Sequence, residues 1–305
     1  MQIAITGATG FLGWHLTTCA LSRGWATRGV VRTPSKGADL VAAGATMARA
    51  DLGDEDALAA AFEGVDVVVA NAALGSGGGD MAAFEAANIR GTENVVRAAA
   101  RAGVRRLVQV STVGVYRVVP WTTVGPDRPL RDESRGLDLT AVTTDVRYAR
   151  TKTRAERRAW ALADELGLPL AVVRPGPIIG SRDTRFTDRV VQQTRAGVRP
   201  VPTIGLPLSH AGDIAAATLE AATRDGAVGR AVVLAGPPIG LHRVYAAVRD
   251  ATGGTARILP VPAPLWTAFD TAEAEQLLGY TTRSVDAMAA EVAANHPGVE
   301  AGSPA

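Results

Sequence analysis

The chain has 305 residues, of which 47% are hydrophobic and 20% are charged. This composition supplies enough apolar material for a sizeable core and excludes global disorder, and the length suits one body with two lobes. Lysine and arginine together number 32 against 30 aspartates and glutamates, a balance that gives no reason to expect a nucleic-acid partner.

A strand-like run begins at Gln2, so we expect no targeting leader, and apolar runs such as 65–73 are too short to span a bilayer. The single cysteine, Cys19, cannot form an intrachain disulfide, and the four histidines are scattered without metal-ligand spacing. The sequence therefore predicts a cytoplasmic protein that binds no metal and no membrane.

Short β-branched runs alternate with longer alanine-rich stretches through the first half, the pattern of successive βαβ units around a parallel sheet. Prolines recur after Arg174 and interrupt short helical segments, which indicates a second lobe. We predict an α/β fold: a Rossmann doubly wound parallel sheet over 1–174, a smaller C-terminal substrate-binding lobe over 175–295 with some elements returning to the sheet, and a flexible tail over 296–305. The predicted strands are 2–6, 26–31, 66–70, 106–110 and 169–173, and the predicted helices are 11–23, 55–62, 81–102 and 146–166.

The first predicted strand runs directly into a glycine-rich turn, Thr6-Gly7-Ala8-Thr9-Gly10-Phe11-Leu12-Gly13, which a helical pattern follows. Gly7, Gly10 and Gly13 allow a tight turn, bring the backbone close to a pyrophosphate and let the helix pack on the sheet. The N-terminus of that helix presents unpaired N–H groups and the positive end of its dipole to the anion. Because the glycines stand between a strand and a helix, they predict a dinucleotide site rather than a turn alone.

The second predicted strand ends in Val30-Val31-Arg32-Thr33-Pro34-Ser35-Lys36, where this fold places the group that contacts the adenosine ribose. An acidic residue there accepts hydrogen bonds from a free 2′-hydroxyl, whereas the guanidinium of Arg32 suits a 2′-phosphate, with Lys36 as a second cation. The alternative is that both are solvated loop charges. The sequence favours NADP(H) as the cofactor, with NAD(H) as the alternative.

The predicted helix 146–166 carries Tyr148 and Lys152 four residues apart, so both lie on one helical face. An ordinary phenol has a pKa of about 10, and lowering it to neutrality takes roughly 4 kcal/mol, which one cation at contact distance can supply. The spacing alone also fits a core aromatic beside a surface lysine. The hydroxyls of Ser111 and Thr112 follow an apolar strand at the carboxyl edge of the sheet, where such folds bind ligands. Together with the glycine-rich turn and these hydroxyls, the Tyr148–Lys152 spacing predicts a proton-transfer site.

These residues resemble a known family, the extended short-chain dehydrogenase/reductases, also described as the NAD-dependent epimerase/dehydratase family. The resemblance covers most of the chain. Its motifs are Thr6-Gly7 to Gly13, Asp51-Leu52, Asn71-Ala72-Ala73, Asn88-Ile89-Arg90-Gly91-Thr92-Glu93-Asn94-Val95, Ser111-Thr112, Tyr148 to Lys152, and Arg174-Pro175-Gly176.

The resemblance implies that Tyr148 is the proton donor and acceptor, that Lys152 lowers its pKa and bonds the nicotinamide ribose, and that Thr112 hydrogen-bonds the substrate oxygen. For Asn88 it leaves a catalytic role and a packing or capping role open. The cofactor-binding residues expected from the turn, the ribose position and the resemblance together are Gly7, Thr9, Gly10, Phe11, Leu12, Gly13, Arg32, Lys36, Asp51, Leu52, Asn71, Ala72, Ala73, Ser111, Tyr148, Lys152, Pro175 and Ile178.

We therefore expect an NADP(H)-dependent oxidoreductase that reduces a ketone or aldehyde, so that its partner is a small-molecule carbonyl or alcohol. The tryptophan-bearing segments 118–121 and 265–266 favour a moderately hydrophobic substrate, and the alternative is that both belong to the core. A nucleotide-sugar epimerase or dehydratase with retained cofactor and a non-catalytic NADP(H)-binding sensor are the alternatives.

Two further features bear on the pocket and on assembly. Arg182, Arg185 and Arg189 fall at helical spacing and either meet an anionic substrate or form a solvated face. Arg117 stands where the family usually has a glycine, so we expect an altered pocket mouth. The resemblance also implies a homodimer paired through the helices 81–102 and 146–166.

Overall fold

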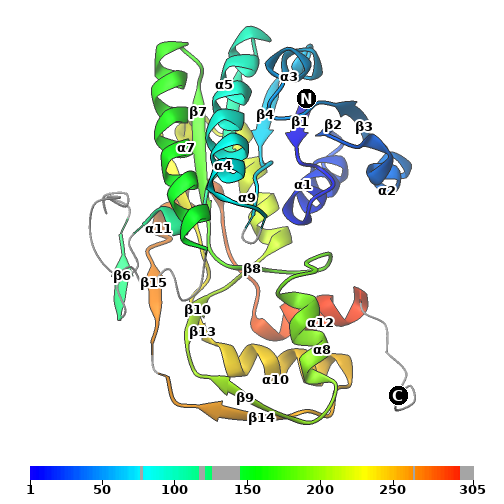
Figure 1. Cartoon of the computed structure of the whole chain (residues 1–305), viewed down its shortest axis with the longest axis vertical. Helices are drawn as coiled ribbons and strands as arrows, with labels where there is room; N and C mark the ends of the chain where they lie inside the picture. Colours follow the sequence, from blue (N-terminus) through cyan, green and yellow to red (C-terminus); the bar gives the residue numbers. More distant parts are fainter. Residues whose placement is uncertain (76–77, 117–120, 126–144, 264, 296–305) are drawn as a thin grey trace.

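The computed structural model describes residues 1–75, 78–116, 121–125, 145–263 and 265–295. A seven-stranded sheet forms the centre of its larger body, and every neighbouring pair of strands in it is parallel. This arrangement confirms the predicted Rossmann-like α/β class (Figure 1). In spatial order the strands are β12 (Ala231–Leu234), β7 (Leu170–Pro175), β5 (Arg106–Val110), β4 (Val67–Ala70), β1 (Gln2–Thr6), β2 (Ala26–Val31) and β3 (Thr46–Arg49).

Helices cover both faces of the sheet, which explains why its central strands are apolar throughout. Along β4, Val67 and Val69 join the core on one face while Val68 joins the core on the other. The first face is packed by α1 (Phe11–Ser22), α9 (Ala211–Thr223) and α11 (Ala272–Leu278), and the second by α3 (Glu55–Phe62), α5 (Gly91–Arg101) and α7 (Val146–Glu165).

Two strands of the sheet were not among those predicted. β3 is a four-residue edge strand whose side chains are half-buried or exposed, so its sequence carries little apolar pattern. β12 lies in the second half of the chain and pairs with β7, with Val232 beside Val173. A pairing across so many residues leaves no trace in local sequence, whereas a strand followed at once by its helix does.

The predicted helix 81–102 is three segments. α4 (Met81–Phe84) leads into a π-helical turn over Glu85–Arg90, and α5 follows without a break in the chain direction. In a π-helical turn one extra residue is accommodated, so the side chains before and after it point in directions that a regular helix does not give. Asn88 lies in this turn and is buried.

The second lobe packs three helices around their own apolar core, below the sheet in Figure 1. They are α8 (Thr187–Thr194), α10 (Leu241–Thr252) and α12 (Val285–Asn295). Among the residues that the structure describes, four two-stranded sheets lie outside the seven-stranded one. They are β9 (Val198–Pro202) with β14 (Arg257–Val261), β10 (Gly205–Pro207) with β13 (Pro238–Gly240), β8 (Ile178–Ile179) with β11 (Ser209–His210), and β6 (Thr122–Val124) with β15 (Thr267–Phe269). A short helix, α2 (Ala38–Ala42), follows β2.

Three of the features expected from the sequence, Arg117, the segment 118–120 and the tail 296–305, lie outside the described residues. Within the described part of the chain, no helix has both the length and the apolar character needed to span a membrane.

Candidate active site

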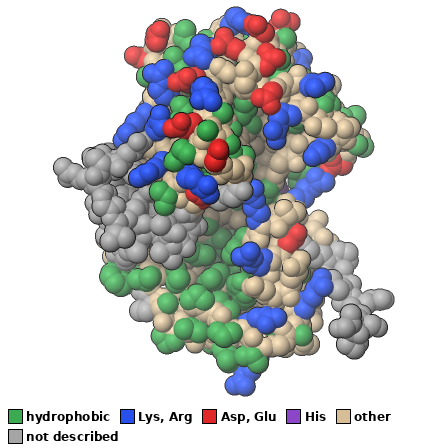
Figure 2. Space-filling view, in the orientation of Figure 1, with side chains coloured by type: hydrophobic (Ala, Val, Ile, Leu, Met, Phe, Trp, Pro, Cys, Tyr) green, Lys and Arg blue, Asp and Glu red, His purple; other side chains and the backbone are tan. Residues whose placement is uncertain are grey.

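A cavity of about 1490 Å³ follows the carboxyl ends of the sheet strands and extends to the second lobe. Pockets for drug-sized ligands measure roughly 300–1,000 Å³, so this one has room for a dinucleotide and a second molecule. Figure 2 shows the hollow between the charged surface of the larger body and a group of hydrophobic side chains on the lobe below. All the predicted site residues line this cavity except Gly13.

The glycine-rich turn connects β1 to α1 at one end of the cavity. Gly7 has a φ of +68°, which favours glycine, and its N–H donates to the carbonyl oxygen of Val30 at 2.8 Å. A Cβ at Gly13 would lie 2.0 Å from the carbonyl oxygen of Gly7, so this glycine is needed for the close approach of α1 to the turn. No side chain caps the N-terminus of α1 at Gly10, which leaves the first N–H groups directed toward the cavity end.

Arg32 and Lys36 lie at the same end of the cavity, after β2, and both are exposed. Within the described chain neither makes an ion pair, in contrast to most arginines on the surface. Asp51 and Leu52 line the wall beside them, and the carboxylate of Asp51 accepts a hydrogen bond from the N–H of Gly53 at 2.8 Å. Two cations therefore stand after β2, the position expected from the sequence to contact the adenosine ribose.

The hydroxyl of Thr6 joins the ends of β1 and β4. Its oxygen accepts hydrogen bonds from the N–H groups of Asn71 and Ala72, each at 3.0 Å. A Cβ at Gly7 would lie 3.0 Å from the Cα of Ala72, so turn and strand end are closely packed. Asn71, Ala72 and Ala73 line the cavity where the resemblance places the cofactor, and Thr6, which sequence reasoning left without a role, sets their position.

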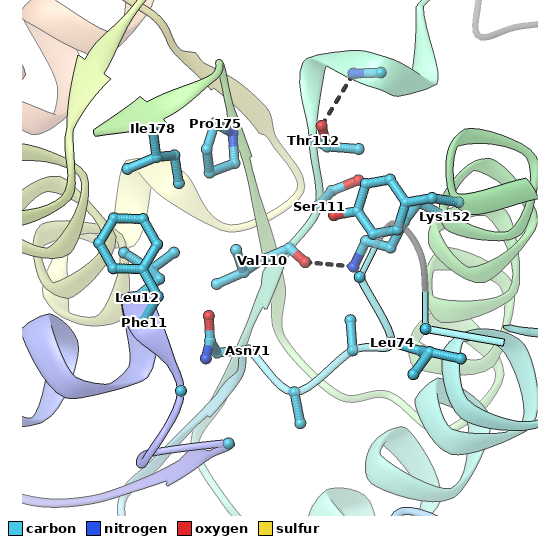
Figure 3. Close-up of a pocket in the computed structure, with 18 of the residues that line it drawn as sticks. Phe11, Leu12, Asn71, Leu74, Val110, Ser111, Thr112, Lys152, Pro175 and Ile178 are labelled. Atoms are coloured by element: carbon cyan, nitrogen blue, oxygen red, sulfur yellow. Dashed lines mark hydrogen bonds between the residues drawn. The ribbon is translucent and has the colours of Figure 1, made fainter. Parts of the chain in front are cut away.

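Tyr148 and Lys152 lie one turn apart on α7, which begins after Asp145, whose carboxylate accepts a hydrogen bond from the N–H of Arg147. The ammonium of Lys152 donates to the carbonyl oxygen of Val110 at 2.7 Å (Figure 3). Burial lowers the pKa of Lys152 to about 8, while the charge of Glu156 acts to raise it. The lysine is thus tied to the end of β5 beside the cavity.

The pKa of Tyr148 follows mainly from its burial in this structure, and the effect of Lys152 on it stays a prediction. Burial raises the pKa of Tyr148 to about 12, and the cation that acts against this effect is Arg185. The ammonium of Lys152 is directed to a backbone carbonyl. A raised pKa keeps the phenol protonated at neutral pH, which is the form that a proton donor needs.

Ser111 and Thr112 follow β5 and differ in where their hydroxyls point (Figure 3). The hydroxyl of Ser111 donates to the carboxylate of Glu156 at 2.5 Å. The hydroxyl oxygen of Thr112 accepts from the N–H of Gly114 at 3.1 Å, so its own proton can still be donated to a ligand in the cavity. The structure therefore favours Thr112 over Ser111 as the substrate contact.

Asn88 has a structural place among its neighbours. Its side-chain oxygen accepts from the N–H of Leu74 at 2.7 Å, and its amide nitrogen donates to the Leu74 carbonyl and to the hydroxyl of Thr151. This side chain therefore holds the backbone after β4 against α7. Of the two roles left open by the sequence, the packing role is the one with visible contacts.

The three arginines at helical spacing separate in the structure. Arg182 binds the carboxylate of Asp39 at 2.6 Å and lies over the ring of Trp14, and so joins the second lobe to the larger body. Arg185 lines the cavity, as Arg182 also does, and it acts on Tyr148. Arg189 lies on α8 outside the cavity lining, so the stripe is not one binding surface.

The opposite end of the cavity, against the second lobe, is mainly apolar. Pro175 and Ile178 face Phe11 and Leu12 across its middle (Figure 3). Beyond them the apolar lining residues are Pro177, Phe186, Ile204, Leu206, Pro207, Leu265, Trp266 and Phe269, and the polar and charged ones are Arg182, Asp183, Thr184, Arg185 and Thr267.

The sequence model of the NAD-dependent epimerase/dehydratase family matches residues 3–235. The chain belongs to the NAD-dependent epimerase/dehydratase family. This membership confirms the resemblance drawn from the motifs, and it accounts for the glycine-rich turn, the parallel sheet and the Tyr148–Lys152 pair in one body.

Curated relatives of this epimerase/dehydratase chain include two reductases. The 2-alkyl-3-oxoalkanoate reductase of Stenotrophomonas maltophilia (strain K279a) is 34% identical over 199 residues, which cover 65% of this chain and 57% of that protein. The 4-hydroxy-2-methyl-3-oxo-4-farnesyl-3,4-dihydroquinoline-1-oxide ketoreductase of Stigmatella aurantiaca is 33% identical over 197 residues, 64% of this chain and 55% of that protein. The chain thus matches little more than half the length of these relatives.

Among solved structures of the family's fold, UDP-glucuronic acid 4-epimerase from Bacillus cereus in complex with NAD aligns with a TM-score of 0.81. The alignment covers 97% of this chain and 96% of that one at 20% identity. At this identity the likeness is one of fold.

Glu156, Arg174 and Tyr116 form a buried network behind the site that sequence reasoning missed. Arg174 donates to the carboxylate of Glu156 from Nε at 3.2 Å and also from Nη2, and its Nη1 donates to the hydroxyl of Tyr116 at 2.5 Å. The signal available was the spacing of Glu156, four residues after Lys152 on the same helical face. Arg174 opens the family motif Arg174-Pro175-Gly176, but the motif gives no sign of its partner.

Proposed function

We propose that this family member is an NADP(H)-dependent carbonyl reductase. The observation that carries the proposal is the grouping of three side chains at one place in the cavity. The phenol of Tyr148, the ammonium of Lys152 and the hydroxyl of Thr112 line it at the carboxyl end of the sheet. A single cavity links them to the glycine-rich turn, so a dinucleotide held by the turn can extend to them.

The residues divide the chemistry of carbonyl reduction among them. When bound, the reduced nicotinamide supplies the hydride that the carbonyl carbon receives. Thr112 donates a hydrogen bond to the carbonyl oxygen and fixes its position. Tyr148 transfers its phenolic proton to that oxygen as negative charge develops there. The ammonium of Lys152 stands one helical turn away and favours the phenolate that remains.

Arg32 and Lys36 support NADP(H) as the cofactor. Arg32 presents a planar fork of donors, and Lys36 adds a second cation within the same cavity end. No acidic side chain follows β2 directly, where an NAD-preferring site would place one.

Replacing Arg32 by glutamate tests this preference. We expect Arg32→Glu to weaken NADPH binding by about 10- to 100-fold, because charge-assisted hydrogen bonds of about 1.5–3 kcal/mol are lost, while NADH binding is unchanged or improved. Fluorescence titration with both dinucleotides measures the effect. Arg49→Glu, at an exposed arginine of β3 outside the cavity lining, is the matched control for charge. Equal changes in NADPH and NADH affinity would contradict a 2′-phosphate contact.

The apolar end of the cavity supports a hydrophobic carbonyl substrate. Trp266, Leu265 and Phe269 offer no charged partner for a diphosphate, and burial of an apolar body against them contributes about 25 cal/mol per Å². The names of the two reductase relatives point to carbonyl chemistry of the same kind.

Oxidation of NADPH in the presence of hydrophobic ketones, aldehydes and oxo acids tests the reductase, with NADH in parallel. We expect stoichiometric loss of absorbance at 340 nm with at least one class of carbonyl compound. The matched panel consists of nucleotide sugars. Formation of product with the cofactor retained and no net loss of NADPH would favour the epimerase alternative. This comparison is needed because Arg185 lines the cavity and could contact an anionic substrate.

A further inference from the structure

The carboxylate of Glu156 lies fully buried on α7, one turn beyond Lys152, and outside the cavity. It accepts a hydrogen bond from Ser111 at 2.5 Å and pairs with Arg174. Tyr148, Lys152 and Glu156 are thus spaced by four along one helical face, from the cavity wall inward. A buried ion is costly unless it is compensated on several sides, so the position of this carboxylate requires an explanation.

We propose that Glu156 is a positioning residue of the reductase site, which fixes Ser111 against the inner wall and balances the charge of Lys152 from behind. The inference rests on the proposed function, since it assigns Lys152 a charge that serves proton transfer at Tyr148. The buried network of Glu156, Arg174 and Tyr116 would then support proton transfer at the site as well as join α7 to β7.

The charged and titratable groups connected to Glu156 and Lys152 come from several elements. Glu156 shares its helix, Arg174 lies on β7, Ser111 ends β5, and Tyr116 receives a hydrogen bond from Arg174. Glu273, on α11, acts on Tyr116 from farther away. Without Glu156, the buried guanidinium of Arg174 would lose its carboxylate partner, and the ammonium of Lys152, which is also buried, would lose the negative charge on its own helix.

The direction of each effect follows from this arrangement. Burial lowers the pKa of Lys152 to about 8, and Glu156 opposes that change. Removal of the carboxylate leaves burial unopposed and leaves the buried charge of Arg174 without its partner carboxylate. Removal of Arg174 instead frees the full charge of Glu156 to act on Lys152. The two substitutions break the same ion pair but shift the pKa of Lys152 in opposite directions.

A purely structural ion pair predicts something different. Either substitution would then destabilise the protein, because each leaves a buried charge without its partner. A purely structural pair does not predict that the pH dependence of carbonyl reduction follows the titration of Lys152. A shift of that titration, in the direction set by the removed charge and with a matching shift in the pH profile of activity, therefore separates the two explanations, whereas a fall in Tm does not.

The composition of the chain makes the titration of Lys152 directly observable. Only two of its residues are lysines, Lys36 and Lys152. Lysine labelled with ¹³C at Cε gives two NMR signals, and the Lys36→Arg chain assigns them. The shift of the Lys152 signal between pH 6 and 10 then reports its protonation in the folded protein without substrate.

We expect Glu156→Gln to increase the deprotonated fraction of Lys152 about tenfold or more at a given pH below the midpoint. Arg174→Met, which keeps much of the apolar stem, is expected to decrease that fraction. The double variant should titrate near the wild type. Glu165→Gln, an exposed glutamate at the end of the same helix, is the matched control and should leave the Lys152 signal unchanged.

The result that overturns the inference is a Lys152 titration that stays in place, or moves the same way, in Glu156→Gln and Arg174→Met. Should Glu156→Gln fail to fold, Arg174→Met and the double variant carry the same comparison. In the NADPH assay, Glu156→Gln should also lose activity at lower pH than the wild type as the pH is raised. A wild-type chain that reduces no carbonyl compound contradicts the proposed function, while an unmoved titration contradicts only this inference.

Discussion

Replacing Tyr148 by phenylalanine should leave NADPH binding intact and slow carbonyl reduction by about 10²- to 10⁴-fold, the usual contribution of a positioned general acid. Phenylalanine keeps the ring that lines the cavity and removes the proton that the alkoxide must receive. The wild-type phenol, with its pKa raised to about 12, holds that proton throughout the neutral range. Single-turnover oxidation of NADPH, recorded beside a binding titration, separates chemistry from affinity.

Tyr245→Phe is the matched control for this substitution. Its hydroxyl donates to the side chain of Gln193 in the second lobe at 2.7 Å, outside the cavity lining. Its loss should leave turnover within about twofold of the wild type, since substitutions away from the site cost little. A Tyr148→Phe chain with undiminished turnover would show that another group donates the proton. A non-catalytic NADP(H) sensor would reduce no carbonyl compound and would bind NADPH equally well as wild type and as Tyr148→Phe.

Alanine at position 13 is expected to have the second large effect. The added Cβ would lie 2.0 Å from the carbonyl oxygen of Gly7, so either α1 must move away from the turn or the turn must open. Overpacking of this kind costs about 1–3 kcal/mol, and strain that falls on the turn weakens dinucleotide binding by roughly 10- to 100-fold. Thermal unfolding with and without NADPH measures both parts.

Thr18→Ala serves as the control for a change on α1. The Thr18 hydroxyl bonds to the carbonyl oxygens of Trp14 and His15 within that helix, so its removal should leave the turn as it is. If Gly13→Ala bound NADPH with wild-type affinity, the close approach of helix and turn would not be what shapes the phosphate site.

Local features of the sequence predicted most of the nucleotide-binding half. The turn after β1 could be recognised because strand, glycines and helix are consecutive, and the Tyr148–Lys152 pair because a helix fixes its spacing. The return of some elements after residue 174 to the sheet could be expected, but β12 could not be located in the sequence, since its partner β7 is separated from it by the second lobe's first elements.

Tertiary contacts decided the features of the site that sequence could not supply. The spacing of Lys152 from Tyr148 gave no sign that its ammonium would bind the carbonyl of Val110. Burial, which no local pattern measures, sets the direction of both pKa changes. Glu156 lay within reach of prediction by spacing, but its partner Arg174 comes from another strand.

The insertion of late elements into the sheet bears on how the polypeptide acquires its structure during synthesis. β12 covers the edge of β7, and α9 packs against α1, β5 and β7, although both follow residue 174. A nascent chain that has emerged only to that point presents an open strand edge and an uncovered apolar face, both prone to self-association. We therefore expect a fragment ending at 174 to aggregate rather than to bind dinucleotide, so the two halves must be expressed as one unit.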